Sequence, residues 1–141
     1  MESAYPPGSI KFKQRYKQLN DFSGILRRRG ITPTDIDGVI DYNGKAFFFL
    51  EGKHEDAQMP NGQKIALQNI VDAIQETGRE AILVLYTHSH SPDQIVDVAL
   101  QVVTMFYYKK QWNKPKKQQT TVLYAVEAFE SFCEQSKNLN L

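Results

Sequence analysis

The sequence is short of several features that would each point to a particular class of protein. It has one cysteine, Cys133, so no internal disulfide framework is available, and we expect this residue to be a small buried apolar side chain on a helix. It has no run of about 18 apolar residues, the length that crosses a bilayer, and no apolar signal segment at its start. We therefore expect a cytoplasmic protein without a membrane partner.

Sequence patterns for several common chemistries are also missing. The chain contains no phosphate-binding loop of the Walker type, no dinucleotide fingerprint and no nucleophile elbow. These absences argue against NTP-driven and acyl-transfer reactions. What remains is an ordinary globular composition over 141 residues, with 41% hydrophobic and 23% charged residues, which is enough chain to bury a core in one domain over 1–141.

The formal net charge of +1 hides a segregation of charges along the chain. Basic residues dominate residues 11–17, 27–29 and 109–117, whereas residues 35–56 are acidic. The acidic residues of this central segment are Asp35, Asp37, Asp41, Glu51, Glu55 and Asp56, against Lys45 and Lys53. Basic segments around an acidic centre suit a protein that holds a polyanion and concentrates a divalent cation on it, although solvated loops and helix faces would give the same composition.

Hydrophobic spacing predicts the order of helices and strands. A polar segment over 9–29 has the spacing of a helix that is interrupted near 20–24, and Asn43-Gly44 predicts a hairpin between two strand-like runs. The expected later elements are a helix over 63–77 that ends at Gly78, a strand over 81–87, a strand or helix over 95–108 and a closing helix over 121–135. This order predicts an α/β (α+β) fold in which a mixed sheet is flanked by helices.

The two later helices each have an apolar stripe that should face the core. For the first helix the stripe is Ile65, Leu67, Ile70, Val71 and Ile74. For the closing helix it is Leu123, Val126, Phe129 and either Phe132 or Cys133.

The end of the second hairpin strand carries an unusual combination of charges. The run FFFLEGKH places Glu51 and Lys53 two residues apart, on one face of a strand that otherwise looks fully buried. Which residues of the first strand face them depends on the loop. If Asn43-Gly44 alone forms it, Ile36 opposes Glu51 and Asp37 points to the other face.

A loop of three residues, 42–44, with a left-handed glycine gives a different register. Asp35 then opposes Glu51, and Asp37 opposes Phe49. In this register one face carries three carboxylates and an amine, and the carboxylates repel one another unless a cation compensates their charge. Mg²⁺ takes hard oxygen ligands, which Asp37, Glu51 and the main-chain carbonyl of Gly52 could provide, and Asp35 could share the metal.

The spacing of these residues resembles a known active-site pattern. Asp37, a gap of hairpin length and then Glu51-Gly52-Lys53 at the end of an apolar strand is similar to the PD-(D/E)xK nuclease superfamily, which has the restriction-endonuclease-like fold. The wider texture, PTDIDGVIDYNGKAFFFLEGKH followed by NGQKIALQNIVDAI, resembles small nucleases of bacteriophages and prophages. The resemblance implies that Asp37 and Glu51 bind Mg²⁺, that Lys53 assists the attacking water and that a helix glutamine, Gln63 or its rival Gln68, supports the site.

The resemblance also implies a function and partners. We expect an Mg²⁺-dependent endonuclease, with Mn²⁺ as a substitute, that hydrolyses phosphodiester bonds of DNA in a bacterial host cytoplasm. The alternative is a catalytically inactive nucleic-acid-binding module of the same fold. So small a domain needs either a homodimer or structure-specific binding to be selective.

Two further groups of residues invite a functional interpretation. His88 and His90 follow a buried strand but lack a second pair of metal ligands, which favours a strand-end or phosphate-contact role. Aromatic and basic residues alternate over 107–114, which suits stacking on unpaired bases, although packing of the aromatic residues on the core explains the pattern as well.

Overall fold

The chain divides into two compact units, residues 1–34 and 35–141. The structure is a computed structural model that describes residues 8, 21–31, 33–55 and 61–141. In the first unit, the described residues form two short 3-10 turns, η1 (Ser23–Ile25) and η2 (Arg28–Gly30). The part of the expected α-helix that follows the interruption at 20–24 is therefore wrong, and the part before the interruption lies outside the described residues. The expectation of one domain over 1–141 stays a prediction.

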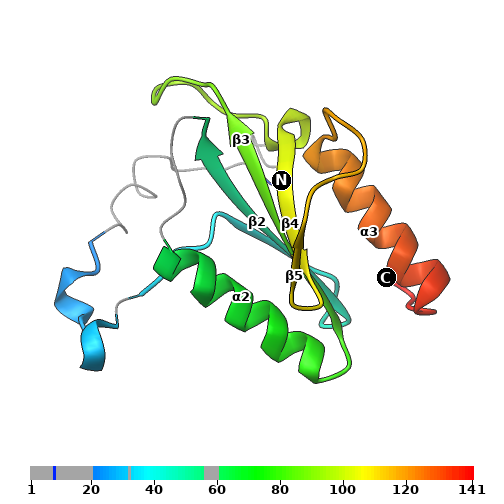
Figure 1. The fold of residues 1–141 in the computed structure, drawn as a ribbon, viewed down its shortest axis with the longest axis horizontal. Helices are drawn as coiled ribbons and strands as arrows, with labels where there is room; N and C mark the ends of the chain where they lie inside the picture. Colours follow the sequence, from blue (N-terminus) through cyan, green and yellow to red (C-terminus); the bar gives the residue numbers. More distant parts are fainter. Residues whose placement is uncertain (1–7, 9–20, 32, 56–60) are drawn as a thin grey trace, which may run out of the picture. The chain divides into compact units, whose positions relative to one another are not determined.

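The second unit is a mixed α+β fold built on a five-stranded sheet (Figure 1). The strands lie side by side in chain order: β1 (Gly38–Asp41), β2 (Ala46–His54), β3 (Glu80–His88), β4 (Val102–Tyr108) and β5 (Gln111–Asn113). β2 and β3 pair in parallel, and the other neighbouring strands pair antiparallel. The helices α2 (Asn61–Glu76) and α3 (Val122–Ser136) complete the unit, with a 3-10 turn, η3 (Val98–Leu100), before β4. Among the described residues, no helix is long and apolar enough to cross a membrane.

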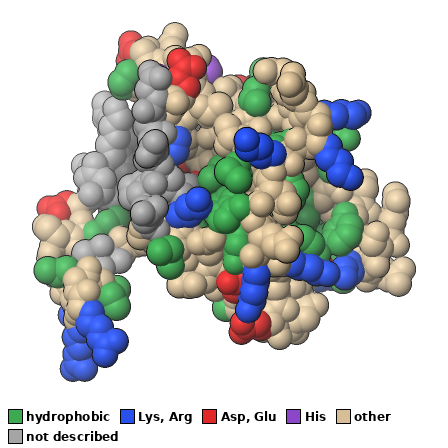
Figure 2. Space-filling model, viewed as in Figure 1, with side chains coloured by type: hydrophobic (Ala, Val, Ile, Leu, Met, Phe, Trp, Pro, Cys, Tyr) green, Lys and Arg blue, Asp and Glu red, His purple; other side chains and the backbone are tan. Residues whose placement is uncertain are grey.

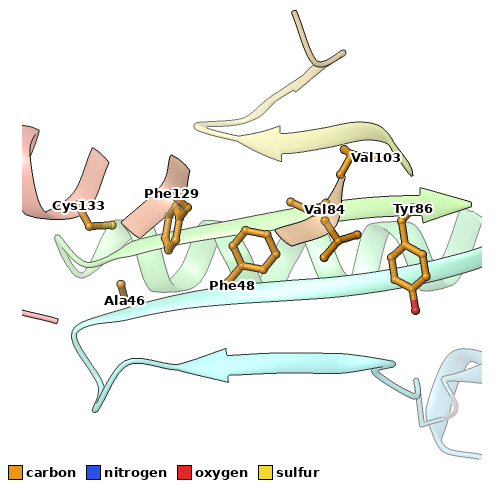
Figure 3. Packing of buried hydrophobic residues seen from close by; sticks show 8 residues of the cluster. Ala46, Phe48, Val84, Tyr86, Val103, Phe129 and Cys133 are labelled. Carbon is orange, nitrogen blue, oxygen red and sulfur yellow. The ribbon is translucent and has the colours of Figure 1, made fainter. Parts of the chain in front are cut away.

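The sheet is buried on both faces at β2 and β3, because α2 connects these two strands and α3 packs on the other side. Phe48 of β2 belongs to a cluster with Phe129 and Cys133 of α3 (Figure 3), and Phe49 belongs to a cluster with Leu67 and Val71 of α2. Successive residues of β2 thus contact different helices. Burial on both faces explains the nearly continuous apolar run of this strand, and the expected burial of Cys133 is confirmed.

Both helices are close to their predicted positions, but the apolar stripes are wrong at one residue each. Ile65 on α2 is 54% exposed, and Leu123 on α3 is 48% exposed. Leu67 and Val122 are buried, so the buried stripe begins at Leu67 on α2 and at Val122 on α3. A stripe predicted from apolar residues alone includes these exposed residues, because helical periodicity does not determine which residue first contacts the sheet.

The segment 95–108 combines an irregular entry with a strand. Residues 102–108 form β4, which confirms the strand interpretation for the second half of the segment. The strand continues through a turn at Lys109 and Lys110 into β5, which the sequence analysis did not predict. Both lysines have left-handed backbone angles (φ 47° and 63°), as the two central residues of a type I′ hairpin turn require.

The hairpin of β1 and β2 has a register that differs from both expected registers. Asn43 and Gly44 have positive φ values of 54° and 78°, and the N–H of Lys45 donates to the carbonyl of Tyr42 at 3.0 Å. The N–H of Tyr42 then donates to the carbonyl of Ala46 at 3.0 Å, so Lys45 is an extra residue after the Asn-Gly pair.

The extra residue moves the pairing by one position relative to a two-residue loop. Gly38 pairs with Leu50, and the same register continued by one residue brings Asp37 opposite Glu51. The expected pairs Ile36–Glu51 and Asp35–Glu51 are both wrong. Directly opposed residues have side chains on the same face of a sheet, so the shift brings the two proposed metal ligands together.

Gly52 allows a close approach between β2 and the β3 side chain beside it. It pairs with Tyr86 in the parallel register, and a Cβ atom at Gly52 would lie 2.4–2.6 Å from two ring carbons and the hydroxyl oxygen of Tyr86. Figure 3 shows the Tyr86 ring reaching across at this end of the cluster. Glycine at this position is therefore a packing requirement of the strand that carries Glu51 and Lys53.

The substitution Gly52→Ala should destabilise the protein by about 1–3 kcal/mol, the usual cost of overpacking, measured by urea denaturation. In a Tyr86→Ala background the same substitution should cost much less, because the ring that it meets is gone. Gly62→Ala is the matched control, since a Cβ at Gly62 meets nothing within 4 Å. An equal cost of Gly52→Ala in both backgrounds would contradict the contact.

Candidate active site

The candidate site lies at the carboxyl end of β2, on the sheet face that bears α2. Along β2, residues 47 and 49 contact α2, so by alternation Glu51 and Lys53 point to the same face. Glu51 is 1% exposed, although it is a carboxylic acid, and Lys53 is partly buried. Because burial of an unpartnered carboxylate is costly, the contacts of Glu51 decide what this site can be.

Both carboxylate oxygens of Glu51 accept hydrogen bonds. The main-chain N–H of Asp37 donates to Oε1 at 2.9 Å, and the Gln63 side-chain amide donates to Oε2 at 2.8 Å. These donors come from the residue before β1 and from the first turn of α2. The carboxylate therefore joins three separate segments of the chain.

The Asp37 side chain in turn accepts a hydrogen bond from the main chain of β2. The N–H of Gly52 donates to Asp37 Oδ2 at 2.8 Å, and Asp37 itself is exposed. In a β-strand the N–H and C=O of one residue point to the same side, so the Gly52 carbonyl also points toward the Asp37 side of β2. An exposed carboxylate and a main-chain carbonyl thus lie next to the buried Glu51.

Gln63 connects the remaining residues of the site. Its amide nitrogen also lies 3.4 Å from Asp35 Oδ1, and its amide oxygen accepts from Lys53 Nζ at 3.3 Å. The structure thus brings the predicted Gln63 to Asp37, Glu51 and Lys53, and gives its rival Gln68 no hydrogen bond to them. In the described residues Lys53 has an amide oxygen as its partner rather than a carboxylate, which leaves its charge uncompensated by an ion pair.

The electrostatic environment of Glu51 favours a proton or a cation. The pKa of its carboxyl group is raised to about 7, chiefly by burial and to a smaller extent by the nearby charges of Asp37 and Asp35. The hydrogen bond from the Asp37 N–H and the charge of Lys53 act in the opposite direction but do not cancel the effect of burial. Near neutral pH the site therefore carries an excess of negative charge that a divalent cation would compensate.

The donor set fits a hard cation that keeps part of its water shell. Asp37, Glu51 and the carbonyl of Gly52 supply oxygen atoms only, and Mg²⁺ sites commonly use one or two carboxylates together with water and substrate phosphate. Among the described residues, no three His, Cys, Asp or Glu side chains are grouped as a protein-only metal site would need. The residues present therefore fit Mg²⁺ or Mn²⁺ that shares its coordination with water and phosphate, and do not fit a closed structural metal site.

The three histidines of the chain lie at the same end of the sheet. His54 and His88 are paired at the ends of β2 and β3, with ring centroids 5.7 Å apart, and His88 and His90 are 5.6 Å apart. The sequence pattern indicated His88 and His90 but not His54, because the pairing between β2 and β3 is not visible in the chain order. A strand-end position is confirmed for His88, and a phosphate-contact role stays a prediction.

Comparison of the chain with family models, curated proteins and solved structures returns no match. Asp37, Glu51, Lys53 and Gln63 were predicted as site residues and lie together, and their functional role stays a prediction. The packing of Tyr86 on Gly52 was not predicted. A parallel pairing of 46–54 with 80–88 would have been the signal for that contact.

The raised pKa of Glu51 predicts a pH-dependent cost of ionisation. Its folded-state value of about 7 lies above the unfolded value of 4.5, so its stabilising contribution is complete below about pH 4.5 and is lost as the pH rises through 7. Glu51→Gln removes this loss. In metal-free buffer the variant should gain stability relative to wild type between these two pH values, by up to about 3 kcal/mol, measured by urea denaturation.

The exposed carboxylate Glu127 on α3 provides the matched control for loss of one charge. If Glu51→Gln and Glu127→Gln show the same pH dependence relative to wild type, the carboxyl group of Glu51 does not have a raised pKa.

Proposed function

We propose that this protein is a divalent-metal-dependent nuclease that hydrolyses phosphodiester bonds of DNA, with a restriction-endonuclease-like fold of the PD-(D/E)xK superfamily. The observation that carries the proposal is the meeting of Asp37, Glu51, Lys53 and Gln63 in one hydrogen-bonded group. Asp37, Glu51 and Gln63 come from separate segments: Asp37 precedes β1, Glu51 lies on β2, and Gln63 lies on α2. A fold that brings together the acids, the amine and the amide of a known pattern supports that pattern far more than the sequence spacing alone.

Each residue has a chemical role that follows from its contacts. Asp37, Glu51 and the carbonyl of Gly52 would hold Mg²⁺ or Mn²⁺. When bound, the metal lowers the pKa of a water molecule and neutralises charge on the phosphate. Glu51 is too buried to act as a free base and serves as a fixed anionic ligand.

Lys53 and Gln63 act on the water and on the geometry of the site. The Lys53 ammonium can donate a hydrogen bond to the attacking water or to a phosphate oxygen, because its partner is a neutral amide oxygen. Gln63 holds the Glu51 carboxylate and the Lys53 ammonium at once, which fixes their separation before substrate binds. Gln63 is therefore a positioning residue.

Basic residues at the surface supply a footprint for nucleic acid. Lys109, Lys110, Lys114, Lys116 and Lys117 are all exposed, and Figure 2 shows Lys and Arg side chains bordering hydrophobic ones on one face of the molecule. Arg27, Arg28 and Arg29 are exposed in the first unit, and residues 11–17 lie outside the described residues. Within the described part of the chain these five lysines form no ion pair, and exposed lysines of this kind favour binding of a phosphate backbone. A homodimer stays a prediction.

Single substitutions at the site should separate metal binding from catalysis. Lys53→Ala leaves both carboxylates, so Mg²⁺ binding by calorimetry should persist while cleavage of a labelled DNA panel falls about 100- to 10,000-fold. Asp37→Ala and Glu51→Ala remove ligands, so metal affinity and cleavage should fall together. The panel contains duplex, flap, four-way-junction and single-stranded DNA.

Lys45→Ala is the matched control, because Lys45 is the exposed lysine at the opposite end of β2 and its Nζ donates to the carbonyl of Asn140. It should cut at the wild-type rate. If wild type binds the metal and cuts no member of the panel, or if Lys53→Ala cuts as fast as wild type, catalysis at this site is refuted and the inactive nucleic-acid-binding module takes its place.

The basic footprint predicts a steep dependence of DNA binding on salt. For duplex DNA the logarithm of affinity should fall by roughly 0.9 per phosphate neutralised as the logarithm of salt rises, measured by fluorescence anisotropy. Joint replacement of Lys114 and Lys116 by glutamine should reduce this slope, and Lys45→Gln should not. A flat salt dependence would point to a protein or small-molecule partner.

A further inference from the structure

Trp112 lies on the α2 face of the sheet, which is also the face of the candidate active site. It pairs with Tyr107 across β4 and β5, and the two ring centroids are 5.2 Å apart. Tyr107 is 5% exposed, whereas Trp112 is partly exposed on the edge strand. An indole supported from below by a buried ring and open to solvent at the edge of a sheet is suited to stacking on another flat group.

The surroundings of Trp112 are fixed by α2. The Tyr107 hydroxyl donates to the Asp72 carboxylate, at 2.9 Å and 3.1 Å from its two oxygens, and the N–H of Lys109 donates to Gln75 Oε1 at 3.2 Å. The hairpin of β4 and β5 is thus tied to the middle and to the last turn of α2.

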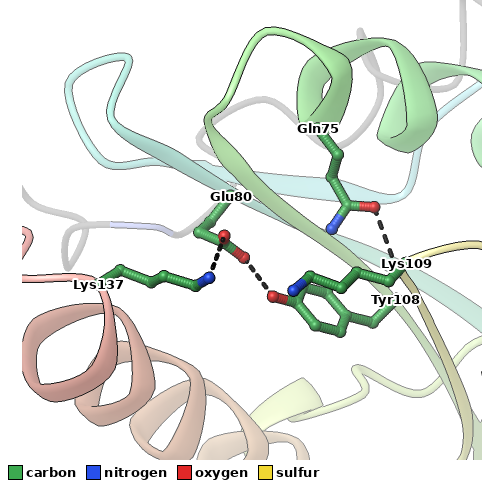
Figure 4. Close-up of polar contacts among 5 residues, drawn as sticks. All are labelled: Gln75, Glu80, Tyr108, Lys109 and Lys137. Carbon is green, nitrogen blue, oxygen red and sulfur yellow. Dashed lines mark hydrogen bonds and ion pairs between the residues drawn. The ribbon is translucent and has the colours of Figure 1, made fainter.

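Figure 4 shows how the same hairpin is held at its tip. Beside the bond from Lys109 to Gln75, the Tyr108 hydroxyl donates to the buried Glu80 at 2.6 Å, and Lys137 lies 3.8 Å from the other oxygen of Glu80. The strained turn at Lys109 and Lys110 is therefore held from α2 and from the start of β3. These contacts fix the hairpin that carries Trp112, and a platform on a rigid support lowers the entropy cost of stacking.

The first turn of α2 links this indole to the active site. Lys64 Nζ lies 4.5 Å from the centroid of the Trp112 ring, and the preceding residue, Gln63, binds Glu51 and Lys53. One helical turn therefore contacts the proposed catalytic group on one side and the indole on the other. Stacking on a base is stronger than an exposed cation–π contact, so a base can displace the ammonium of Lys64 toward the adjoining phosphate.

We propose that Trp112 is a stacking platform for an unpaired base of the substrate, with Lys64 on its phosphate. The substrate class follows: a nucleic acid with a single-stranded segment next to the cleavage site, because a base within a duplex has no free face to offer. This role in substrate binding rests on the proposed nuclease function, but the stacking contact itself requires neither a metal ion nor cleavage.

The chain has one tryptophan, so its intrinsic fluorescence reports on Trp112 alone. In metal-free buffer, titration with single-stranded oligothymidylate should quench this emission, with a midpoint equal to that of binding measured by anisotropy of labelled oligonucleotide. The matching duplex should bind with little quenching. Binding of the single strand without any change in emission, or equal quenching by the duplex, would overturn the proposal.

Variants test the same contact without relying on tryptophan emission. Trp112→Ala should weaken single-strand binding about 5- to 150-fold, the effect of losing one stacked base, and Trp112→Phe should recover most of the affinity. Lys64→Gln should lower the salt slope by roughly 0.7 on single strands. The controls are Ile65→Ala, an exposed apolar residue of the same turn, and Lys45→Gln, which should both bind as wild type.

The outcomes separate this inference from the proposed function. If Trp112→Ala loses its fold by circular dichroism, Trp112→Phe and Lys64→Gln still decide, because both keep the packing of the hairpin. If the protein cleaves DNA but single-stranded DNA does not quench the Trp112 emission, the stacking platform is refuted and the nuclease function is not. Quenching by single strands without cleavage of any substrate would support the platform and refute catalysis.

Discussion

Burial of the Glu51 carboxylate is the constraint on which the second unit depends. A carboxylate that is 1% exposed has lost most of its water, and the protein must replace that hydration with fixed donors. The Asp37 N–H and the Gln63 amide are these donors, and each belongs to a different segment. The hairpin register and the position of the first turn of α2 are thereby determined by one side chain.

The two faces of β2 have different roles at residues 51–53. Glu51 and Lys53 face α2, whereas Gly52 between them faces Tyr86 on the other side. A side chain at position 52 would push Tyr86 away or shift β2, and either movement would displace the carboxylate and the amine on the opposite face. Packing on the α3 side therefore controls geometry on the α2 side.

Much of this arrangement could be predicted from the sequence. The hairpin, α2 and the central strand could be predicted from local patterns. These patterns are the Asn43-Gly44 pair, the apolar run that ends at Glu51 and the helical periodicity that ends at Gly78. The acid pair, the amine and Gln63 were predicted because their pattern resembles a known active site.

The register of the hairpin could not be predicted, because the extra residue could stand before or after the Asn-Gly pair. In the structure the extra residue is Lys45, after the pair. This register places Asp37 rather than Asp35 opposite Glu51, and that contact is non-local. β5 was missed because three residues carry too weak a pattern. Ile65 and Leu123 were misplaced because helical periodicity defines a stripe but not the residue at which the stripe meets the sheet.

α2 explains how a small sheet can position groups that are far apart in the sequence. Its first turn holds Glu51 and Lys53 through Gln63, and further along it holds the β4–β5 hairpin through Asp72 and Gln75. A helix is stiff over this length, so the separation between the edge strand and the end of β2 is set by helix geometry rather than by loops. Any ligand that contacts both regions would meet a surface whose spacing is fixed before binding, and this preorganisation would lower the entropy cost of binding.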